Sequence, residues 1–176
     1  MIIILYIFLA LIGMLLLLSL IAPKNYDVSR SVLINRPKSE VFEVLKSLKY
    51  QDTWSPWAKK DPNMKKEFRG VDGEVGSVSY WLGNKDVGEG EQEITKIEPM
   101  ERIEGELRFL KPFKSTSNCY FLTTEEAGKT KVVWGFKGEN KFPMNIMMLF
   151  MSMDKMVGKD FEEVLTTLKA NLENKS

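Results

Sequence analysis

The sequence predicts an α+β fold, in which an antiparallel sheet of about seven strands curves around a long C-terminal helix and a single transmembrane helix precedes the domain. Three observations predict it. The first 22 residues are almost wholly apolar, and the middle of the chain alternates apolar and polar side chains between turn signals. The C-terminal segment carries an apolar stripe at helical spacing. Residues 1–23 are therefore predicted to form an anchor, and residues 24–176 one domain.

The N-terminal segment is long enough to cross a membrane. Residues 2–22 contain no charge and no proline, and at a rise of 1.5 Å per residue they span about 30 Å. A cleaved signal peptide is the alternative. It would need a basic start and a small residue near the cut, whereas only Met1 precedes the run and Leu20 stands where cleavage after Ala22 requires a small side chain. These features favour a retained anchor.

Positive charge lies on one side of this segment. Lys24, Arg30, Arg36 and Lys38 follow its end, and only the terminal amine precedes it. Because cytoplasmic flanks are enriched in Lys and Arg, we expect a single-pass protein of the cell membrane with its domain in the cytoplasm. A lone cysteine, Cys119, agrees with a reducing compartment.

The domain begins with a strand and two helical pieces. Residues 26–34 alternate as a half-buried strand does, and a helix with one apolar face begins near Pro37. Residues 50–57 contain two tryptophans and a proline, which predicts a short helix and a turn that pack against the domain.

Residues 65–139 predict an antiparallel meander. Turn signals recur roughly every 10 to 15 residues without helical patterns between them. Acidic side chains such as Glu91 and Glu104 fall in the register opposite the apolar ones, so one face of the sheet is expected to be solvated. The apolar stripe from Met153 to Leu172 predicts a final helix that covers the other face.

Composition excludes several chemistries. The 25 Lys and Arg nearly balance 24 Asp and Glu, and the chain has no histidine. A Ser-His-Asp triad, a Cys-His pair, a Cys/His zinc site and an internal disulfide are therefore impossible. A net charge of +1 gives no reason to expect a nucleic-acid partner. We expect neither a metal nor a cofactor.

Six segments carry a family resemblance. They are PKSEVFEVL (37–45), WSPW (54–57), GVDGEVGS (70–77), EPMERIEGE (98–106), TKVVWGF (130–136) and GKDFEEVLTTL (158–168). With the order of elements, they resemble the START-like (SRPBCC) superfamily of the polyketide cyclase/dehydrase and lipid-transport type, which has the helix-grip fold. The resemblance covers about residues 26–172.

The resemblance implies a cavity between the sheet and the last helix that holds a hydrophobic small molecule or a lipid. It supplies no catalytic residue that can be assigned here. Side chains expected on the inner face are the candidates to line the cavity. They are Tyr80, Leu82, Ile94, Leu107, Phe109, Tyr120, Trp134, Phe136, Met153, Val157 and Phe161.

Two other functions stay open. A cyclase or dehydratase would use an inward Tyr80 or Tyr120, or a carboxylate, to move a proton, and an interaction or stress-response scaffold would hold no ligand. The methionine-rich residues 144–156 are expected to pack in the core, the alternatives being a flexible gate or contact with the nearby bilayer.

Overall fold

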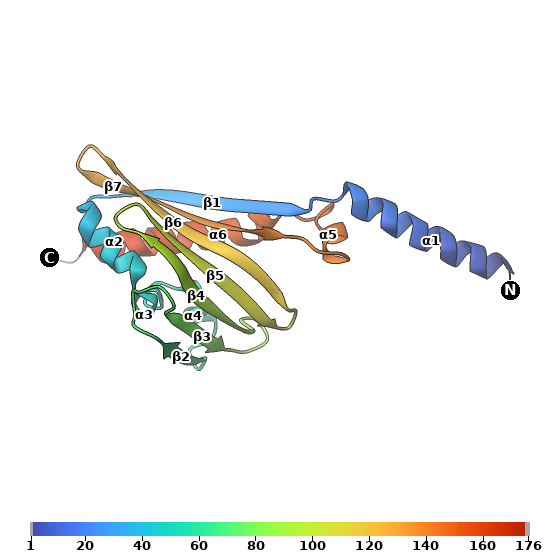
Figure 1. Cartoon of the computed structure of the whole chain (residues 1–176), viewed down its shortest axis with the longest axis horizontal. Helices are drawn as coiled ribbons and strands as arrows, with labels where there is room; N and C mark the ends of the chain where they lie inside the picture. Colours follow the sequence, from blue (N-terminus) through green and yellow to red (C-terminus); the bar gives the residue numbers. More distant parts are fainter. Residues whose placement is uncertain (1, 175–176) are drawn as a thin grey trace.

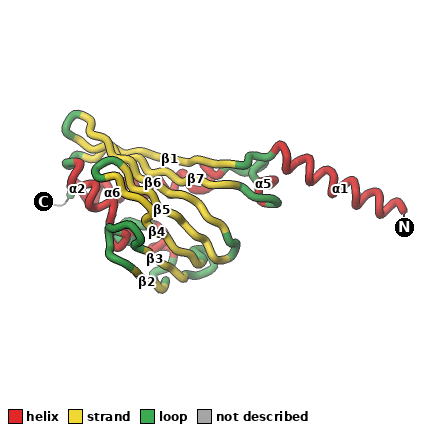
Figure 2. The backbone as a smooth tube through the Cα atoms, viewed as in Figure 1, coloured by secondary structure: helices red, strands yellow, loops and turns green. Residues whose placement is uncertain are grey.

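The computed structural model describes residues 2–174, the side chains of residues 58 and 59 excepted, and consists of one antiparallel sheet, the helices that pack on it and a projecting N-terminal helix (Figures 1 and 2). Met1 of the predicted anchor and residues 175–176 of the predicted domain lie outside the described residues. The elements, in chain order, are α1 (Ile2–Ile21), β1 (Asn25–Ile34), α2 (Lys38–Lys46), α3 (Leu48–Gln51), α4 (Pro56–Lys60), β2 (Lys65–Arg69), β3 (Val78–Leu82), β4 (Glu89–Glu98), β5 (Arg102–Lys111), β6 (Ser115–Glu126), β7 (Lys129–Glu139), α5 (Met144–Met147) and α6 (Met153–Glu173).

The sheet has seven strands in the order β1-β7-β6-β5-β4-β3-β2, and all neighbours are antiparallel. Each strand from β2 to β6 pairs with the next one in sequence, as short turns favour. β1 crosses the molecule to pair with β7. The predicted fold class is confirmed: a sheet of seven strands grips the long C-terminal helix.

The core lies between one face of the sheet and helices α2 and α6. Apolar side chains meet there from β1, β4, β7 and both helices, and each fully buried one stabilises the fold by roughly 1.5–3 kcal/mol. Fully buried examples are Ile34, Val41, Leu45, Ile94, Val132, Val164 and Leu168. This face is called the inner face below, and the opposite one the outer face.

Three glycines in the sheet are each covered by an aromatic ring from the directly paired residue. Gly135 pairs with Tyr120, Gly138 with Tyr26, and Gly90 with Trp81. A Cβ atom at Gly135 would lie 2.0 Å from the Tyr120 ring. The rings therefore occupy the space that a side chain on the partner strand would otherwise fill, a known way to compensate a strand glycine.

Helix α1 projects from the domain, and its last turn is attached to α5 (Figure 1). The buried Asn145 donates from its amide nitrogen to the Ser19 carbonyl and to the Ser19 hydroxyl, both at 2.9 Å. Ala22 is also buried. The described residues contain one helix that is long and apolar enough to cross a membrane, Ile2–Ile21.

Substituting Gly135→Ala should lower the free energy of unfolding by about 1–3 kcal/mol, because the new methyl overlaps the Tyr120 ring and forces it or the strand aside. Adding Tyr120→Ala removes the overlap, so the double variant should lose less stability than the sum of the two single variants. Urea unfolding of the detergent-solubilised chain, followed by tryptophan fluorescence, measures this cycle. Additive losses would contradict the proposed contact.

Candidate functional site

Aromatic packing fills the centre of the grip. The Trp134 ring on β7 stacks on Phe161 of α6 with ring centroids 3.9 Å apart and an interplanar angle of 13°. Phe121 also stacks on Trp134, at 5.7 Å, and Trp54 and Trp57 meet Trp134 edge-on, each at 6.4 Å. The sheet and the last helix are therefore in direct contact at this level.

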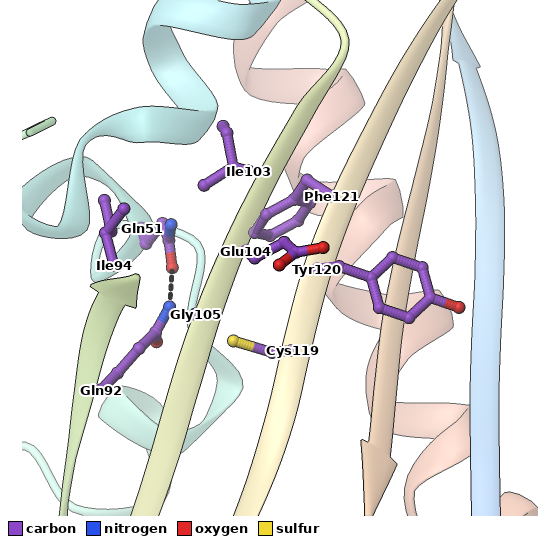
Figure 3. Close-up of a pocket in the computed structure, with 9 residues that line it drawn as sticks. All are labelled: Gln51, Gln92, Ile94, Ile103, Glu104, Gly105, Cys119, Tyr120 and Phe121. Atoms are coloured by element: carbon purple, nitrogen blue, oxygen red, sulfur yellow. Dashed lines mark hydrogen bonds between the residues drawn. The ribbon is translucent and has the colours of Figure 1, made fainter. Parts of the chain in front are cut away.

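A small hollow adjoins this packing. It measures about 10 Å³ and is bordered by Ile94, Gly105 and Cys119, with Gln92 donating to Gln51 at 3.3 Å across its edge (Figure 3). Such a volume holds about one water molecule. The cavity expected between sheet and helix is thus closed at the centre of the described domain, because Trp134, Phe121 and Phe161 occupy it.

The inner face continues past this centre as a row of four rings. Trp81, Phe109, Phe136 and Tyr26 lie on β3, β5, β7 and β1, and successive centroids are 6.2, 6.5 and 5.3 Å apart. We call these four residues the aromatic row. Phe136 is buried, but the other three are only half-buried, so the row is one place where the apolar interior reaches the surface.

The row lies toward one end of the sheet. Tyr26 is near the start of β1, and Phe109 pairs with Ser115 beside the β5–β6 turn. Leu107, Met153 and Val157 are half-buried apolar neighbours that pack on the same core. We call this end, where α1 leads into β1, the open end.

One hydroxyl lies within the row. The Tyr26 hydroxyl and the Ser117 Oγ are 2.7 Å apart, and burial raises the pKa of Tyr26 even though the bond to Ser117 lowers it. The phenol is therefore neutral at physiological pH. It can bind a polar end of an apolar molecule by hydrogen bonding.

Three predicted cavity residues lie on the outer face instead. The pairing of Trp81 with Gly90 turns Tyr80 and Leu82 outward, and the pairing of Phe121 with Trp134 turns Tyr120 outward. Leu82 is 37% exposed. The prediction that these three residues line the inner face is therefore wrong. Both faces of β3 and β6 carry large apolar side chains, so alternation alone does not decide which face of each strand is turned toward the core.

The two outward tyrosines are engaged with carboxylates. Tyr80 donates to Glu89 at 2.8 Å, which raises its pKa, and Tyr120 donates to Asp27 at 3.1 Å. Burial, followed by the bond to Asp27, raises the pKa of Tyr120. Neither hydroxyl can act on a molecule held on the inner face.

The other eight predicted cavity residues lie on the inner side of the grip. Ile94, Trp134 and Phe161 belong to the closed centre, and Phe136 joins the centre to the row. Leu107, Phe109, Met153 and Val157 lie at the half-buried surface. Tyr26, Trp57 and Trp81 also lie here and are not among the residues predicted from the sequence. Two strand glycines in the sequence indicate where such rings can pack. Gly90 pairs with Trp81 and Gly138 with Tyr26, and a strand glycine leaves room for the ring of its partner.

The outer face carries the charges that alternation predicted. Arg108 binds Glu91, Glu93 and Glu106 at 2.6 to 2.8 Å, and Arg69 also binds Glu91. Burial alone would raise the pKa of Glu91, but the bonds from Arg108 and Arg69 lower it overall. These carboxylates are held in ion pairs on the outer face, and an acid/base role for them is disfavoured.

Beside this network the outer face is hollowed over Gly105. The depression has a volume of about 200 Å³, and its polar border includes Arg102, Glu104, Asn118 and Lys137. Arg102 and Lys137 both lie over the Tyr120 ring, at 5.3 and 5.9 Å from its centroid. The depression is polar and lies on the outer face, so it is distinct from the aromatic row on the inner face.

Helix α6 is held to the edge strand by an ionic clamp. Arg30 on β1 binds Asp154 at 2.7 Å and Glu162 at 2.8 Å. Gly158 lies between them, and a Cβ there would come 2.2 Å from the Arg30 guanidinium. The hydrogen bond from Arg30 lowers the pKa of Asp154.

Thiol and metal chemistry find no support in the described part of the chain. Burial raises the pKa of Cys119 to about 12, so its thiolate is scarcely populated at neutral pH. Residues 2–174 contain no group of three or more Cys, Asp or Glu side chains arranged to hold a metal ion.

The sequence model of the family described as polyketide cyclase / dehydrase and lipid transport matches residues 26–173. The chain belongs to this family. The match leaves residues 1–25 and 174–176 outside the family domain, so the aromatic row, the centre of the grip and α5 all fall within it.

Solved structures agree on the fold. Mll3558 from Rhizobium loti is 18% identical, with a TM-score of 0.59 over 83% of this chain and 96% of its own. The ginseng major latex-like protein 151 from Panax ginseng is 11% identical, with a TM-score of 0.58 over 84% and 97%. The Aha1 dimer from Colwellia psychrerythraea is 16% identical, with a TM-score of 0.54 over 86% and 99%. At these identities the likeness shows the helix-grip fold alone. No curated protein matches the sequence.

The ionic clamp should make the stability of this family member depend on pH. Because the folded pKa of Asp154 is depressed, its contribution is present above the ordinary Asp value of about 3.9 and is lost as pH falls through the folded value. Asp154→Asn should therefore lower the free energy of unfolding at neutral pH, and the difference from wild type should shrink in acid. Denaturant titrations across pH, with Asp86→Asn on the exposed β3–β4 turn as a control, test it. A difference independent of pH would contradict the clamp.

Proposed function

We propose that the chain is a membrane-anchored, START-like ligand-binding protein that holds a hydrophobic small molecule or a lipid on the aromatic row. The observation that carries the proposal is the half-buried state of Trp81, Phe109 and Tyr26 at the open end. Large rings partly exposed on the concave side of a helix-grip sheet offer apolar area to a ligand, worth roughly 25 cal/mol per Å² buried. Membership of a family described by lipid transport supports the same class of ligand.

The closed centre shapes this proposal. Because Trp134 and Phe161 are in contact, a ligand would bind between the row and the first turns of α6, where Met153 and Val157 are half-buried. Methionine is flexible enough to move aside for an apolar chain. The Tyr26 hydroxyl and the nearby Ser117 would orient the polar end of the ligand.

The anchoring part of the proposal rests on α1. The helix has the length and hydropathy of a membrane span, and its last turn provides Ser19 as the partner of the buried Asn145 amide. Cleavage after Ala22 would remove that partner and leave a buried polar group without it, which is costly. The cations that follow α1, such as Lys24 and Arg36, favour a cytoplasmic domain.

A ligand-free interaction domain is the second candidate, and the filled centre favours it. A cyclase or dehydratase has less support, since Tyr80 and Tyr120 point outward and Tyr26 is the phenol that remains on the row. The ligand experiment separates the first two, because an interaction domain has no need of a molecule on the row.

Native mass spectrometry of the full chain, released from detergent, should detect an apolar molecule bound by the domain, in addition to any lipids that surround α1. Phe109→Ala removes part of the proposed contact area and should weaken binding of a fluorescent fatty acid by about 2 kcal/mol, or about thirtyfold in Kd. Tyr80→Phe is the control, because it removes a hydroxyl on the outer face of β3 and should leave binding unchanged.

Two results would overturn the binding proposal. One is the absence of any bound molecule in wild type together with no binding of the fatty-acid probe. The other is equal binding by wild type, Phe109→Ala and Tyr80→Phe, because the probe would then lie away from the aromatic row.

A further inference from the structure

An exposed apolar surface adjoins the C-terminal end of α1. Six large apolar side chains between residues 142 and 156 face solvent, and Phe150 is 82% exposed. The six, called the methionine patch below, are Phe142, Met144, Met147, Phe150, Met151 and Met156. The prediction that this run packs in the core is therefore wrong for Met144, Met147, Met151 and Met156. The first two belong to α5, which lies beyond the end of the sheet (Figure 1).

The position of the patch is fixed relative to α1. Asn145, in the middle of the patch, bonds Ser19 at 2.9 Å, and Ser19 lies inside the apolar helix, two residues before its end at Ile21. Two residues of helix amount to about 3 Å along its axis. If α1 spans a bilayer, α5 therefore lies at the boundary between headgroups and hydrocarbon.

A third exposed phenylalanine, outside the patch, occurs at the same end. Phe113, in the β5–β6 turn, is 72% exposed. Ser117 and Tyr26 both pair with Gly138, so the start of β6 and the start of β1 lie at the same end of the sheet. The β5–β6 turn thus faces the direction from which α1 enters.

Charges around these apolar residues suit an anionic lipid surface. The chain has no acidic residue between Glu139 and Asp154, and Asp154 is bound to Arg30. Lys114 and Lys141 flank Phe113 and Phe142, and Lys155 precedes Met156; all three lysines are exposed. Exposed apolar side chains beside lysines are typical of segments that lie in a membrane interface.

We propose that the methionine patch, with Phe113, is buried in the headgroup region of the bilayer that α1 spans, so that the open end of the grip faces the lipid. This inference rests on the anchoring part of the proposed function and not on ligand binding. Its consequence is that a lipid-like molecule would reach the aromatic row from the bilayer without crossing bulk water.

Spin labels on introduced cysteines test the proposal in the full chain, reconstituted into vesicles of phosphatidylcholine and phosphatidylglycerol. Phe150→Cys reports on the patch, and Glu125→Cys, exposed near the β6–β7 turn at the opposite end of the sheet, is the matched control. Leu9→Cys reports on α1. The native Cys119 is buried with a raised pKa, and labelling of the wild-type chain checks that it stays unmodified.

For each label the collision ratio is the rate of collision with oxygen divided by the rate of collision with a water-soluble nickel complex. This ratio should be several-fold higher at residue 150 than at residue 125. Equal collision ratios at 150 and 125, with a lipid-like ratio at 9, would overturn the patch proposal and leave the anchor intact. An aqueous ratio at 9 would overturn both. Spin–spin broadening at 150 that disappears on dilution with unlabelled chain would place a second copy on the patch and overturn the proposal.

Discussion

The contact between Trp134 and Phe161 joins the sheet to the C-terminal helix, and the rest of the domain is arranged around it. The two rings stack at 3.9 Å, which sets how closely α6 approaches β7, and Phe121, Trp54 and Trp57 pack around the pair. Stacked and edge-on rings bury large areas in defined geometry. Arg30 then fixes α6 along the edge strand by binding Asp154 and Glu162.

This contact also decides where a ligand can bind. Since the centre is closed, a ligand would have to bind where rings are incompletely covered, as they are along Trp81, Phe109 and Tyr26. The same end of the sheet receives α1 and adjoins the methionine patch. Helix α1, the methionine patch and the aromatic row therefore lie at one end of the domain, the arrangement that the proposed exchange of an apolar molecule with a membrane would need.

The sequence was sufficient for the fold because each element has a local signal. Alternation in residues 65–139 and the apolar stripe of α6 identified the sheet and the helix that it grips. It was not sufficient to orient β3 and β6, since both of their faces are apolar and the face is set by cross-strand partners such as Trp134 for Phe121. The exposure of Met147 and Phe150 depends on where α5 docks, which is a tertiary property that periodicity does not contain.

The central claim is that the aromatic row is an apolar site open to the bilayer. Photocrosslinking of the full chain in vesicles that contain a phospholipid with a diazirine in its acyl chain tests it most directly, with the labelled residues mapped by mass spectrometry. The account predicts adducts on Trp81, Phe109 or Met153 in addition to those on residues 2–21. Adducts confined to residues 2–21, with the row unmodified, would contradict it.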